Sequence, residues 1–232
     1  MSKVLVIGGG FAGVSAATAL AEKGFAVELL ESRGSLGGRV YSSENPSFPA
    51  PVDNGPHLFM GCYEETWNLF KRLGAPNAFT RIDPLKLSWL TTDKKKVALN
   101  CAPLPAPLHL AWGLLTTNAF SWREKVNLTK ALFHFSKEPF SFPADVQTVE
   151  RFIIYTEQVT QAIERFWVPL CNAVMNVPID IAPLTGLGEV LRRVFFGKRS
   201  DSALVIAQKP LSDLGFSGVG SYLEKRGGKL RV

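Results

Sequence analysis

A glycine-rich run that follows a short apolar segment constrains the fold of this chain more than any other feature. The apolar run 4–7 leads directly into Gly8, Gly10 and Gly13, which have the spacing G-x-G-x-x-G. Residues 14–23 then place apolar side chains at helical spacing. A strand, a tight glycine turn and a helix in this order predict a βαβ unit that binds a dinucleotide.

Each glycine of this run has a physical task. Gly8 permits the tight turn from strand to helix, Gly10 lets the backbone approach a pyrophosphate, and Gly13 lets the helix pack closely on the sheet. The helix N-terminus, with Phe11 and Ala12, offers free N–H groups and the positive end of the helix dipole to phosphate oxygens. We therefore expect all five residues to contact the cofactor.

An acid at the end of the second predicted strand, 25–30, narrows the type of dinucleotide. Glu31 stands eighteen residues after Gly13. Its carboxylate can accept hydrogen bonds from both hydroxyls of a ribose and would repel a phosphate on that ribose. The alternative, a glycine-rich turn in an ordinary βαβ unit, does not account for the agreement of motif, helix and acid.

A second glycine pair followed by an arginine indicates a flavin dinucleotide. Gly37 and Gly38 let the chain pass close to a cofactor, and Arg39 can place its guanidinium on phosphate oxygens. Arg33 is a further candidate contact. An NAD enzyme has no need of this second loop, whereas a permanently held flavin does, so we expect FAD. The alternative for Arg39 is an ordinary surface arginine.

With these motifs the chain resembles the FAD-dependent amine oxidase and phytoene desaturase superfamily, whose fingerprint is G-x-G-x-x-G, then Glu, then G-G-R. The D-N-G-x-H form within 52–57 and G-C-Y at 61–63 resemble its squalene-associated branch, hydroxysqualene dehydroxylase. The stretches L-P-A-P-L-H at 104–109, W-V-P-L at 167–170 and P-L-S-D-L at 210–214 are similar to that branch too. The resemblance covers essentially the whole chain.

The resemblance implies an FAD-dependent oxidoreductase that removes the hydroxyl of hydroxysqualene, a long lipophilic isoprenoid, to give squalene for hopanoid synthesis. Asn54, Gly55 and His57 would lie near the flavin, where we favour a positioning role for His57 over proton transfer. No residue is identified as the catalytic acid. Pro56 stands where the branch commonly has Gln, and Gly-Pro also resembles carotenoid desaturases. A carotenoid or phytoene-type desaturase is therefore the alternative.

The resemblance also implies the fold class and the domains. We expect an α/β fold in which a doubly wound, Rossmann-like FAD-binding domain is interrupted by a mostly helical substrate domain with a small antiparallel sheet. The N-terminal part of the FAD-binding domain would span 1–84, the substrate domain 85–226, and 227–232 would begin a strand returning to the first domain. Because the family continues beyond such a strand, we expect a C-terminally truncated chain. A non-catalytic remnant that needs a complementing C-terminal chain is the alternative of another class.

Local patterns predict further elements. A hairpin is expected over 85–99, and a capping box formed by Ser121 and Glu124 predicts a helix start. Helices are predicted over 64–73, 121–135, 148–155, 156–174, 183–196 and 212–226.

The apolar, proline-interrupted segment 102–120 is too broken to span a bilayer. It predicts either an interfacial or tunnel-mouth segment or a packed helix, and the sequence leaves the two open. In the first case Leu108, Leu110 and Leu114 would help a lipid substrate leave the membrane, which implies peripheral membrane contact.

Charge and cysteine content limit the partners. The net charge of +6 suits anionic ligands or an anionic membrane surface, but the run at 94–96 reads better as a solvated hairpin tip than as a nucleic-acid patch. Cys62, Cys101 and Cys171 are isolated, so we expect no metal site and a reducing compartment. The apolar run at the N-terminus is short for a secretory signal. We expect a cytoplasmic protein that contacts membranes and binds no nucleic acid.

Overall fold

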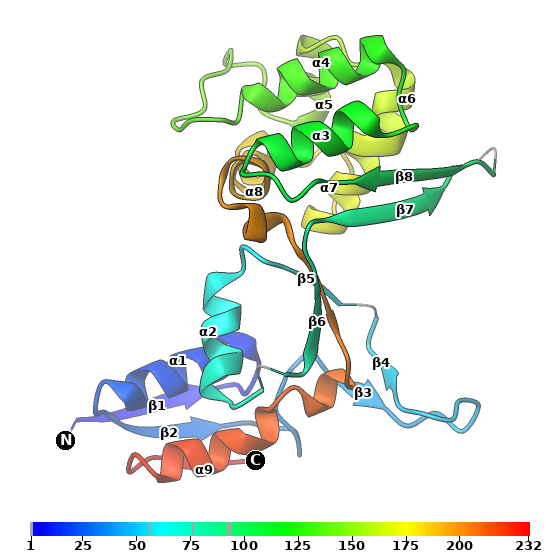
Figure 1. Ribbon diagram of the computed structural model, residues 1–232. Coiled ribbons are helices and arrows are strands. Elements are labelled where there is room, and N and C mark those ends of the chain that lie inside the picture. The colour runs from blue at the N-terminus through cyan, green and yellow to red at the C-terminus, as the bar shows by residue number, and fades with distance from the viewer. Residues whose placement is uncertain (1, 56, 76, 92–93) are drawn as a thin grey trace. The chain divides into compact units, whose positions relative to one another are not determined.

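The computed structural model describes every residue except 1, 56, 76 and 92–93, and the chain folds into two compact units (Figure 1). Unit 1 consists of Met1–Phe59, Tyr63–Arg81 and Val205–Val232, and unit 2 of Met60–Cys62 and Ile82–Leu204. The chain crosses between the units within three strands, which form a sheet in the order β5-β9-β6. These strands are β5 (Leu58–Met60), β6 (Phe79–Ile82) and β9 (Leu204–Ala207).

A three-stranded parallel sheet is the centre of unit 1. Strand β1 (Lys3–Ile7) leads through helix α1 (Phe11–Glu22) to β2 (Ala26–Leu30), and β10 (Lys229–Arg231) pairs with the other edge of β2. The order is therefore β1-β2-β10, and the expected strand that returns to this sheet is confirmed. The glycine that follows the C-cap of α1, Gly24, has a φ of 83°, which allows the chain to reverse into β2.

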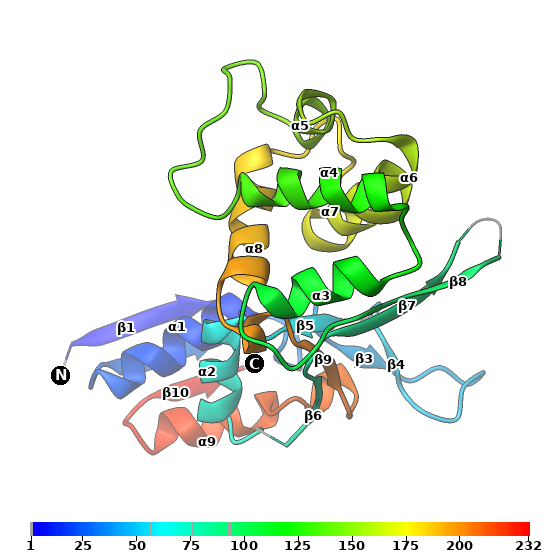
Figure 2. The same ribbon diagram turned by 45° about the horizontal axis from the view of Figure 1, so that its top comes forward.

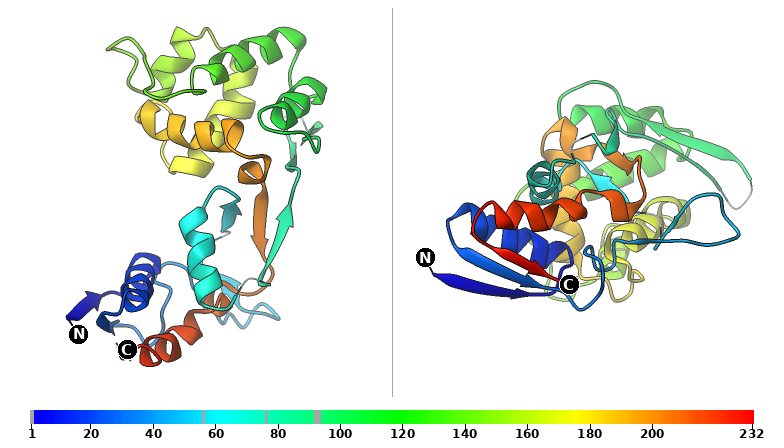
Figure 3. Two further views of the ribbon diagram at one scale, coloured as in Figure 1. Left: turned by 60° about the vertical axis from the view of Figure 1, so that its left-hand side comes forward. Right: turned by 90° about the horizontal axis from the view of Figure 1, so that it is seen from below.

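One face of this sheet is covered and the other is open. Val27 and Leu29 of β2 are buried against α1 and against α9 (Val219–Glu224), and Figure 3 shows both helices on the same side of the strands. On the opposite side Leu5 is 56% exposed and Ile7 is 80% exposed. Side chains alternate across a strand, so the inward residues of β1 and β2 form the core while the outward ones lack cover.

Shorter elements complete unit 1. Strands β3 (Ser42–Ser43) and β4 (Val52–Asp53) form an antiparallel pair, and helix α2 (Glu64–Arg72) ends before Gly74, whose φ is 74°. An aromatic cluster packs α2 against the crossing strands. Its rings lie 4.6–6.1 Å apart and belong to Phe59, Trp67, Phe70 and Phe79.

The segment 205–226 belongs to unit 1 and not, as the sequence predicted, to the substrate domain. Its apolar side chains are buried in the core of unit 1, and they are Val205, Leu211, Leu214, Phe216, Val219 and Leu223. The single helix expected over 212–226 is also wrong. Two 3₁₀ turns, η3 (Leu211–Asp213) and η4 (Phe216–Gly218), precede the short α9, because Gly215 adopts a φ of 94° that interrupts a helix.

Unit 2 is mostly helical with one antiparallel hairpin (Figure 2). Strands β7 (Lys86–Leu90) and β8 (Lys96–Asn100) confirm the expected hairpin, although residues 92–93 of its tip lie outside the described residues. The helices are α3 (Leu108–Thr116), α4 (Trp122–Phe133), α5 (Val149–Tyr155), α6 (Thr160–Ala162), α7 (Val168–Met175) and α8 (Leu184–Phe196), with a π turn η1 (Ile163–Trp167) and a 3₁₀ turn η2 (Arg199–Ser202). The capping box of α4 is confirmed.

The core of unit 2 explains why these helices hold together. Phe135, Phe152 and Trp167 are fully buried, and the indole N–H of Trp167 donates to Gln158 at 3.3 Å. The helix expected over 156–174 begins only at Thr160, because Glu157 adopts a φ of 51°. After the short α6, residues Ile163–Trp167 form the π turn η1, which ends just before Pro169 in the first turn of α7.

Helix α3 packs one side in the core of unit 2, as the packed-helix alternative for 102–120 predicted, and leaves its other side exposed. Leu110 and Leu114 are 4% and 6% exposed and pack in the core of unit 2, so they are not available to a membrane. Leu108, on the other side of α3, is 56% exposed. Within the described part of the chain, no helix combines the length and the apolar character that a bilayer crossing requires.

Candidate functional site

The turn from β1 into α1 depends on two glycines. Gly8 has a φ of 100°, and its N–H donates to the carbonyl of Leu30 at 2.8 Å. A Cβ atom on Gly13 would overlap the carbonyl oxygen of Gly8, so a side chain there would push the helix away from the turn. The structure thus gives Gly8 and Gly13 the steric tasks that the motif predicted.

The first turn of α1 is open to an anion. Its N-cap residue, Gly10, is extended, with a φ of −75° and a ψ of −179°, and supplies no side-chain cap. No acidic residue occupies the first turn. The N–H groups at this end, which include those of Phe11 and Ala12, therefore have no side-chain acceptor from the cap and lie at the positive end of the helix dipole.

The second glycine loop touches the first through the backbone. The N–H of Gly37 donates to the carbonyl of Gly9 at 2.8 Å, and Gly10 and Gly37 form an isolated parallel bridge. Gly38 has a φ of 64°, and a Cβ atom on it would lie 3.1 Å from the Cα of Gly10. A side chain at Gly38 would therefore crowd the first loop, and its positive φ also favours glycine.

Glu31 fastens the first loop to the end of β2. Its Oε2 accepts the N–H of Gly9 at 2.6 Å, and its Oε1 accepts the N–H of Arg33 at 2.8 Å and the hydroxyl of Ser32 at 3.2 Å. The hydrogen bond from Arg33 and then that from Gly9 lower the pKa of Glu31 below its usual value, so the carboxylate stays ionised. Each oxygen retains a further lone pair for a ligand hydroxyl.

Gly9 is a site residue that the sequence analysis missed. A Cβ atom on Gly9 would overlap the side chain of Leu36, and its N–H and carbonyl bind Glu31 and Gly37 respectively. The motif treats this position as variable. The only signal in the sequence was the uninterrupted run of three glycines at 8–10.

Arg39 presents an available cation beside the glycine loops. The residue is exposed, and its guanidinium has no hydrogen-bond or ion-pair partner among the described residues. Its backbone is fixed instead, because the side-chain amide of Asn54 donates to the Arg39 carbonyl at 2.9 Å. Arg33 places one guanidinium N–H 3.5 Å from the carbonyl of Gly38, a long contact that leaves its other donors to solvent.

Short-range hydrogen bonds connect Gly55 with Asp53 and with His57. Gly55 has a φ of 78°, and Nδ1 of His57, when it carries the proton, donates to the carbonyl of Gly55 at 3.0 Å. This bond orients the half-buried imidazole. Pro56, on which the sequence comparison of the two branches depends, lies outside the described residues.

Asp53 and Ser42 connect the two ends of unit 1 and were not anticipated from the sequence. Oδ1 of Asp53 accepts the hydroxyl of Ser42 at 2.6 Å and the N–H of Leu211 at 3.0 Å. The hydroxyl oxygen of Ser42 in turn accepts the N–H of Ser212 at 3.2 Å. No local sequence pattern predicts these hydrogen bonds, because Ser42 and Asp53 are far from Leu211 and Ser212 along the chain.

The side chain of Phe11 is part of the core and not of the site. Its ring packs edge-on against Phe70 at 5.6 Å and against Phe216 at 5.3 Å. Only the backbone of Phe11 can therefore contribute to a cofactor site, as the neighbouring Ala12 does through its N–H.

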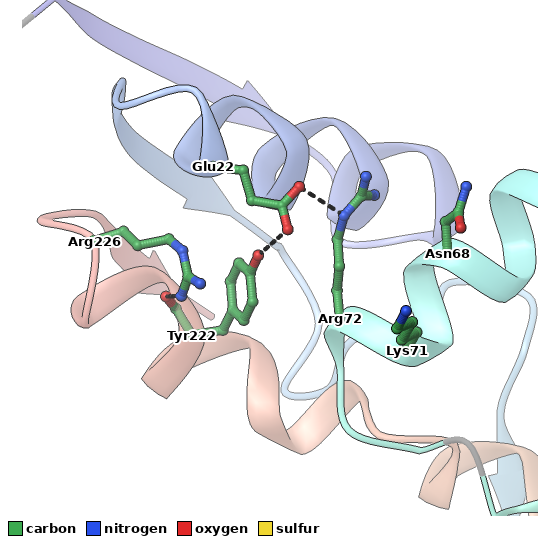
Figure 4. Close-up of a pocket in the computed structure, with 6 residues that line it drawn as sticks. All are labelled: Glu22, Asn68, Lys71, Arg72, Tyr222 and Arg226. Carbon is green, nitrogen blue, oxygen red and sulfur yellow. Dashed lines mark hydrogen bonds and ion pairs between the residues drawn. The ribbon is translucent and has the colours of Figure 1, made fainter.

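A separate polar pocket of about 430 Å³ lies at the other end of α1 (Figure 4). Oε2 of Glu22 accepts Nε of Arg72 at 2.9 Å, and its Oε1 accepts the hydroxyl of Tyr222 at 2.8 Å. The guanidinium of Arg226 lies 3.8 Å from the ring centroid of Tyr222. α1 has 12 residues, and its length of about 18 Å separates this pocket from the glycine loops. The polar side chains that line this pocket therefore hold α1, α2 and α9 together, and we assign them a structural role.

The residues at the glycine loops fit the diphosphate and ribose of FAD. The N–H groups of the uncapped helix start and the unpaired guanidinium of Arg39 supply neutral and charged donors for phosphate, beside two glycine loops that lie close together. Glu31 supplies acceptors for ribose. Among the described residues, no group of three or more His, Cys, Asp or Glu side chains could hold a metal ion.

Comparisons with known proteins agree with this arrangement. A family model for flavin containing amine oxidoreductase matches residues 11–232. The chain is 25% identical over 242 residues to zeta-carotene desaturase of Arabidopsis thaliana, which covers 99% of this chain and 43% of the relative. It is 32% identical over 133 residues to 15-cis-phytoene desaturase of Narcissus pseudonarcissus, with coverage of 56% and 23%.

A solved structure shares the fold. An oxidoreductase from Methanosarcina mazei aligns with a TM-score of 0.65 at 16% identity, over 99% of this chain and 50% of that one. The expected α/β, Rossmann-like fold class is thereby confirmed. The chain spans less than half the length of the curated relatives that it matches.

Proposed function

Because the chain belongs to the flavin-containing amine oxidoreductase family, whose cofactor is FAD, we propose that the protein is an FAD-dependent oxidoreductase acting on a long-chain polyisoprenoid. The single observation that carries the proposal is the backbone contact between the two glycine loops, with Glu31 bonded to the first loop and Arg39 unpaired beside the second.

In this proposal the chain's own residues bind and orient the cofactor. The N–H groups at the start of α1 and the guanidinium of Arg39 would hold the diphosphate, and Glu31 would accept ribose hydroxyls. Asn54 keeps the Arg39 backbone in place, and His57, oriented by Gly55, would position the flavin half. When bound, FAD supplies two-electron chemistry, by donating a hydride in a dehydroxylation or accepting one in a desaturation.

For the substrate we propose hydroxysqualene, which would be reductively dehydroxylated to squalene in hopanoid biosynthesis. The support comes from the sequence: the D-N-G-x-H form within 52–57, G-C-Y at 61–63 and L-P-A-P-L-H at 104–109. Hydride would replace the hydroxyl, which leaves as water after gaining one proton, so the reaction consumes one reduced flavin for each product molecule.

A carotenoid or phytoene-type desaturase is the second candidate. It is favoured by the names of the two plant relatives, a zeta-carotene desaturase and a 15-cis-phytoene desaturase. Both candidates use a lipophilic isoprenoid, and they differ in the direction of hydride transfer.

The proposal extends to location and to a further polypeptide. The thiols of Cys62, Cys101 and Cys171 are buried and form no disulfide in the described part of the chain. This suits a reducing compartment, and we propose that the protein is cytoplasmic. The exposed side chains of Leu5 and Ile7 lie on the open face of the sheet. We propose that a complementing polypeptide covers this face, because uncovered apolar strand faces are costly in water.

The proposed function is tested by measuring first the flavin bound to the purified chain and then the products that it forms. The chain is purified, its bound flavin is measured by absorbance, and it is incubated with hydroxysqualene and reduced FAD, or with phytoene, oxidised FAD and a quinone. Squalene in the first reaction would support the dehydroxylase, and dehydrogenated phytoene in the second would support the desaturase.

The remaining outcomes are also informative. Bound flavin without either product, if it persists when the complementing polypeptide described next is co-expressed, would contradict the polyisoprenoid substrate but not the cofactor. If the chain holds no flavin, it is co-expressed with a polypeptide that supplies the portion of the desaturase relatives it does not match. Recovery of flavin and turnover would then support a chain that needs its complement, whereas continued absence of both would favour a non-catalytic remnant.

A further inference from the structure

We propose that the exposed side of α3, together with Trp122 at the start of α4, docks on an anionic lipid surface. The name α3 patch is used here for Leu108, Trp112, Leu115 and Trp122. The inference goes beyond the proposed function, because it requires neither a cofactor nor a substrate. It also replaces the set Leu108, Leu110 and Leu114 that the sequence suggested, since two of these three side chains are buried.

The α3 patch is apolar and accessible. Leu108 is 56% exposed, Trp112 52%, Leu115 48% and Trp122 68%. The first three occupy positions i, i+4 and i+7 and therefore share one side of α3. A helix that packs one side in a core and presents leucine and tryptophan on the other has the form of a helix that lies in a lipid interface, where the amphipathic indole ring is favoured.

Hydrogen bonds tie the start of α4 to the end of α3. Nζ of Lys125 donates to the carbonyl of Leu115 at 2.7 Å, and Trp122 stands one helical turn before Lys125. Figures 1 and 2 both show α3 and α4 as neighbouring helices of unit 2. Asn118 follows α3 and donates to the carbonyl of Lys96 at 3.3 Å, which brings the lysine-rich end of β8 to the same end of the helix.

The sequence from Lys94 to Lys137, which contains the α3 patch, is rich in cations and poor in acids. From Lys94 to Lys137 the chain has seven Lys or Arg residues and one acid, Glu124. That acid is 5% exposed, and its carboxylate accepts the N–H of Ser121 at 2.6 Å in the capping box. An exposed apolar surface in a cationic stretch of chain, whose one acid is enclosed, is complementary to anionic headgroups above an apolar layer.

The same charges argue against a second copy of this chain as the occupant. In a two-fold dimer the patch would meet itself, so that Arg123 and Lys125 of the two copies would approach each other. Such like-charge contact opposes association, whereas phosphate groups of lipids attract the same side chains.

The experiment measures binding of the 232-residue chain to vesicles by flotation. Vesicles of phosphatidylcholine alone are compared with vesicles that also contain phosphatidylglycerol. We expect binding to the mixed vesicles, weaker binding to the neutral ones, and a decrease with salt. The triple variant L108S/W112S/L115S should bind at least about tenfold more weakly, since three large apolar side chains leave the interface.

The matched control is Ile154→Ser on α5. Ile154 is 63% exposed in the same unit and lies outside the α3 patch, so its replacement should leave vesicle binding unchanged. Circular dichroism of both variants checks that the fold is kept, which is expected because every replaced side chain is exposed. Arg123→Glu should reduce binding to the mixed vesicles and leave binding to the neutral ones nearly unchanged.

The proposal is overturned if the wild-type chain does not float with the mixed vesicles, or if the folded triple variant binds as well as the wild type. It is also overturned if the wild type is a dimer that the triple variant dissociates while neither binds vesicles, because the occupant would then be a second copy. Loss of binding in Ile154→Ser to the same extent would show unspecific apolar adsorption and would contradict the assigned surface.

Discussion

Glu31 accepts the backbone N–H of Gly9 at 2.6 Å, which joins the end of β2 to the loop after β1. The carboxylate therefore shapes the glycine turn before any ligand arrives. A residue chosen from the sequence for its acceptors toward ribose thus has a second task, since it holds the backbone whose N–H groups would meet the diphosphate.

Replacement of Glu31 by Gln tests this double task. We expect roughly tenfold weaker FAD binding, because the charge-assisted bonds to Gly9 and Arg33 are lost. Titration with FAD measures the effect. Glu28→Gln is the control, because Glu28 lies on the same strand but pairs with Arg231. Equal weakening in both variants would contradict a specific role for Glu31.

The same carboxylate predicts a pH dependence. Hydrogen bonds hold the pKa of folded Glu31 below its ordinary value, so its contribution to the turn is present above that ordinary value and is lost as pH falls through the lowered pKa. FAD affinity of the wild type should fall on acidification in that range, measured by titration at a series of pH values. Glu31→Gln should lose this part of the pH dependence.

Gly13→Ala should disrupt the turn. Its Cβ would overlap the carbonyl oxygen of Gly8, and separating the two atoms should cost about 1–3 kcal/mol of stability as well as FAD binding. Urea unfolding and flavin content provide the measurements. Gly34→Ala is the matched control, because its Cβ would meet no atom within 4 Å. A stable, flavin-loaded Gly13→Ala protein would show that the helix does not need this close approach.

Arg39→Ala should weaken FAD binding by about 1.5–3 kcal/mol, because a charge-assisted contact with phosphate is removed. Folding stability should stay nearly unchanged, since the guanidinium has no partner in the described part of the chain. Arg39→Lys should recover only part of the affinity, because lysine lacks the planar fork. Undiminished flavin in the alanine variant would remove Arg39 from the site.

His109 should make unit 2 sensitive to acid. The residue is fully buried, its Nε2 lies 2.9 Å from the hydroxyl of Ser202, and burial lowers its pKa below the ordinary value. Below about pH 6.5 the unfolded chain gains a proton that the folded chain resists, so stability is lost as pH falls toward the lowered pKa.

The measurement for His109 is the urea midpoint at about pH 7.5 and about pH 5.5. His109→Gln cannot gain the proton and should flatten the difference between the two midpoints. His134→Gln is the control, because His134 is exposed on the same unit. If the wild type and His109→Gln lose equal stability on acidification, another group is responsible.

Short-range features were predictable from the sequence. The helix of α1 with its glycine turn and the capping box of Ser121 and Glu124 formed as expected from local patterns, and the return of β10 to β2 formed as the family resemblance implied. In the first two cases the determining interactions lie within a few residues along the chain. The role of Gly9 escaped prediction, because its partners Glu31 and Gly37 are distant along the chain.

Packing decided the remaining features. The sequence assigned 205–226 to the second domain, but Leu214, Phe216 and Val219 found their apolar partners in unit 1. The bonds from Asp53 to Ser42 and Leu211 close the same unit across a long loop of chain. The domain to which a segment belongs depends on which apolar surfaces pack together. A sequence pattern shows which side of a helix is apolar but not which other element covers that side.

The sequence by itself determined the dinucleotide turn, its acid and the second glycine loop, because backbone conformation and charge at these positions follow from residue type. Only the tertiary structure decided that Leu110 and Leu114 enter the core while Leu108, Trp112 and Leu115 stay exposed. All five are apolar residues on one short helix. They differ in exposure because the rest of unit 2 packs against only one side of α3. The sequence of the helix alone does not specify which side that is.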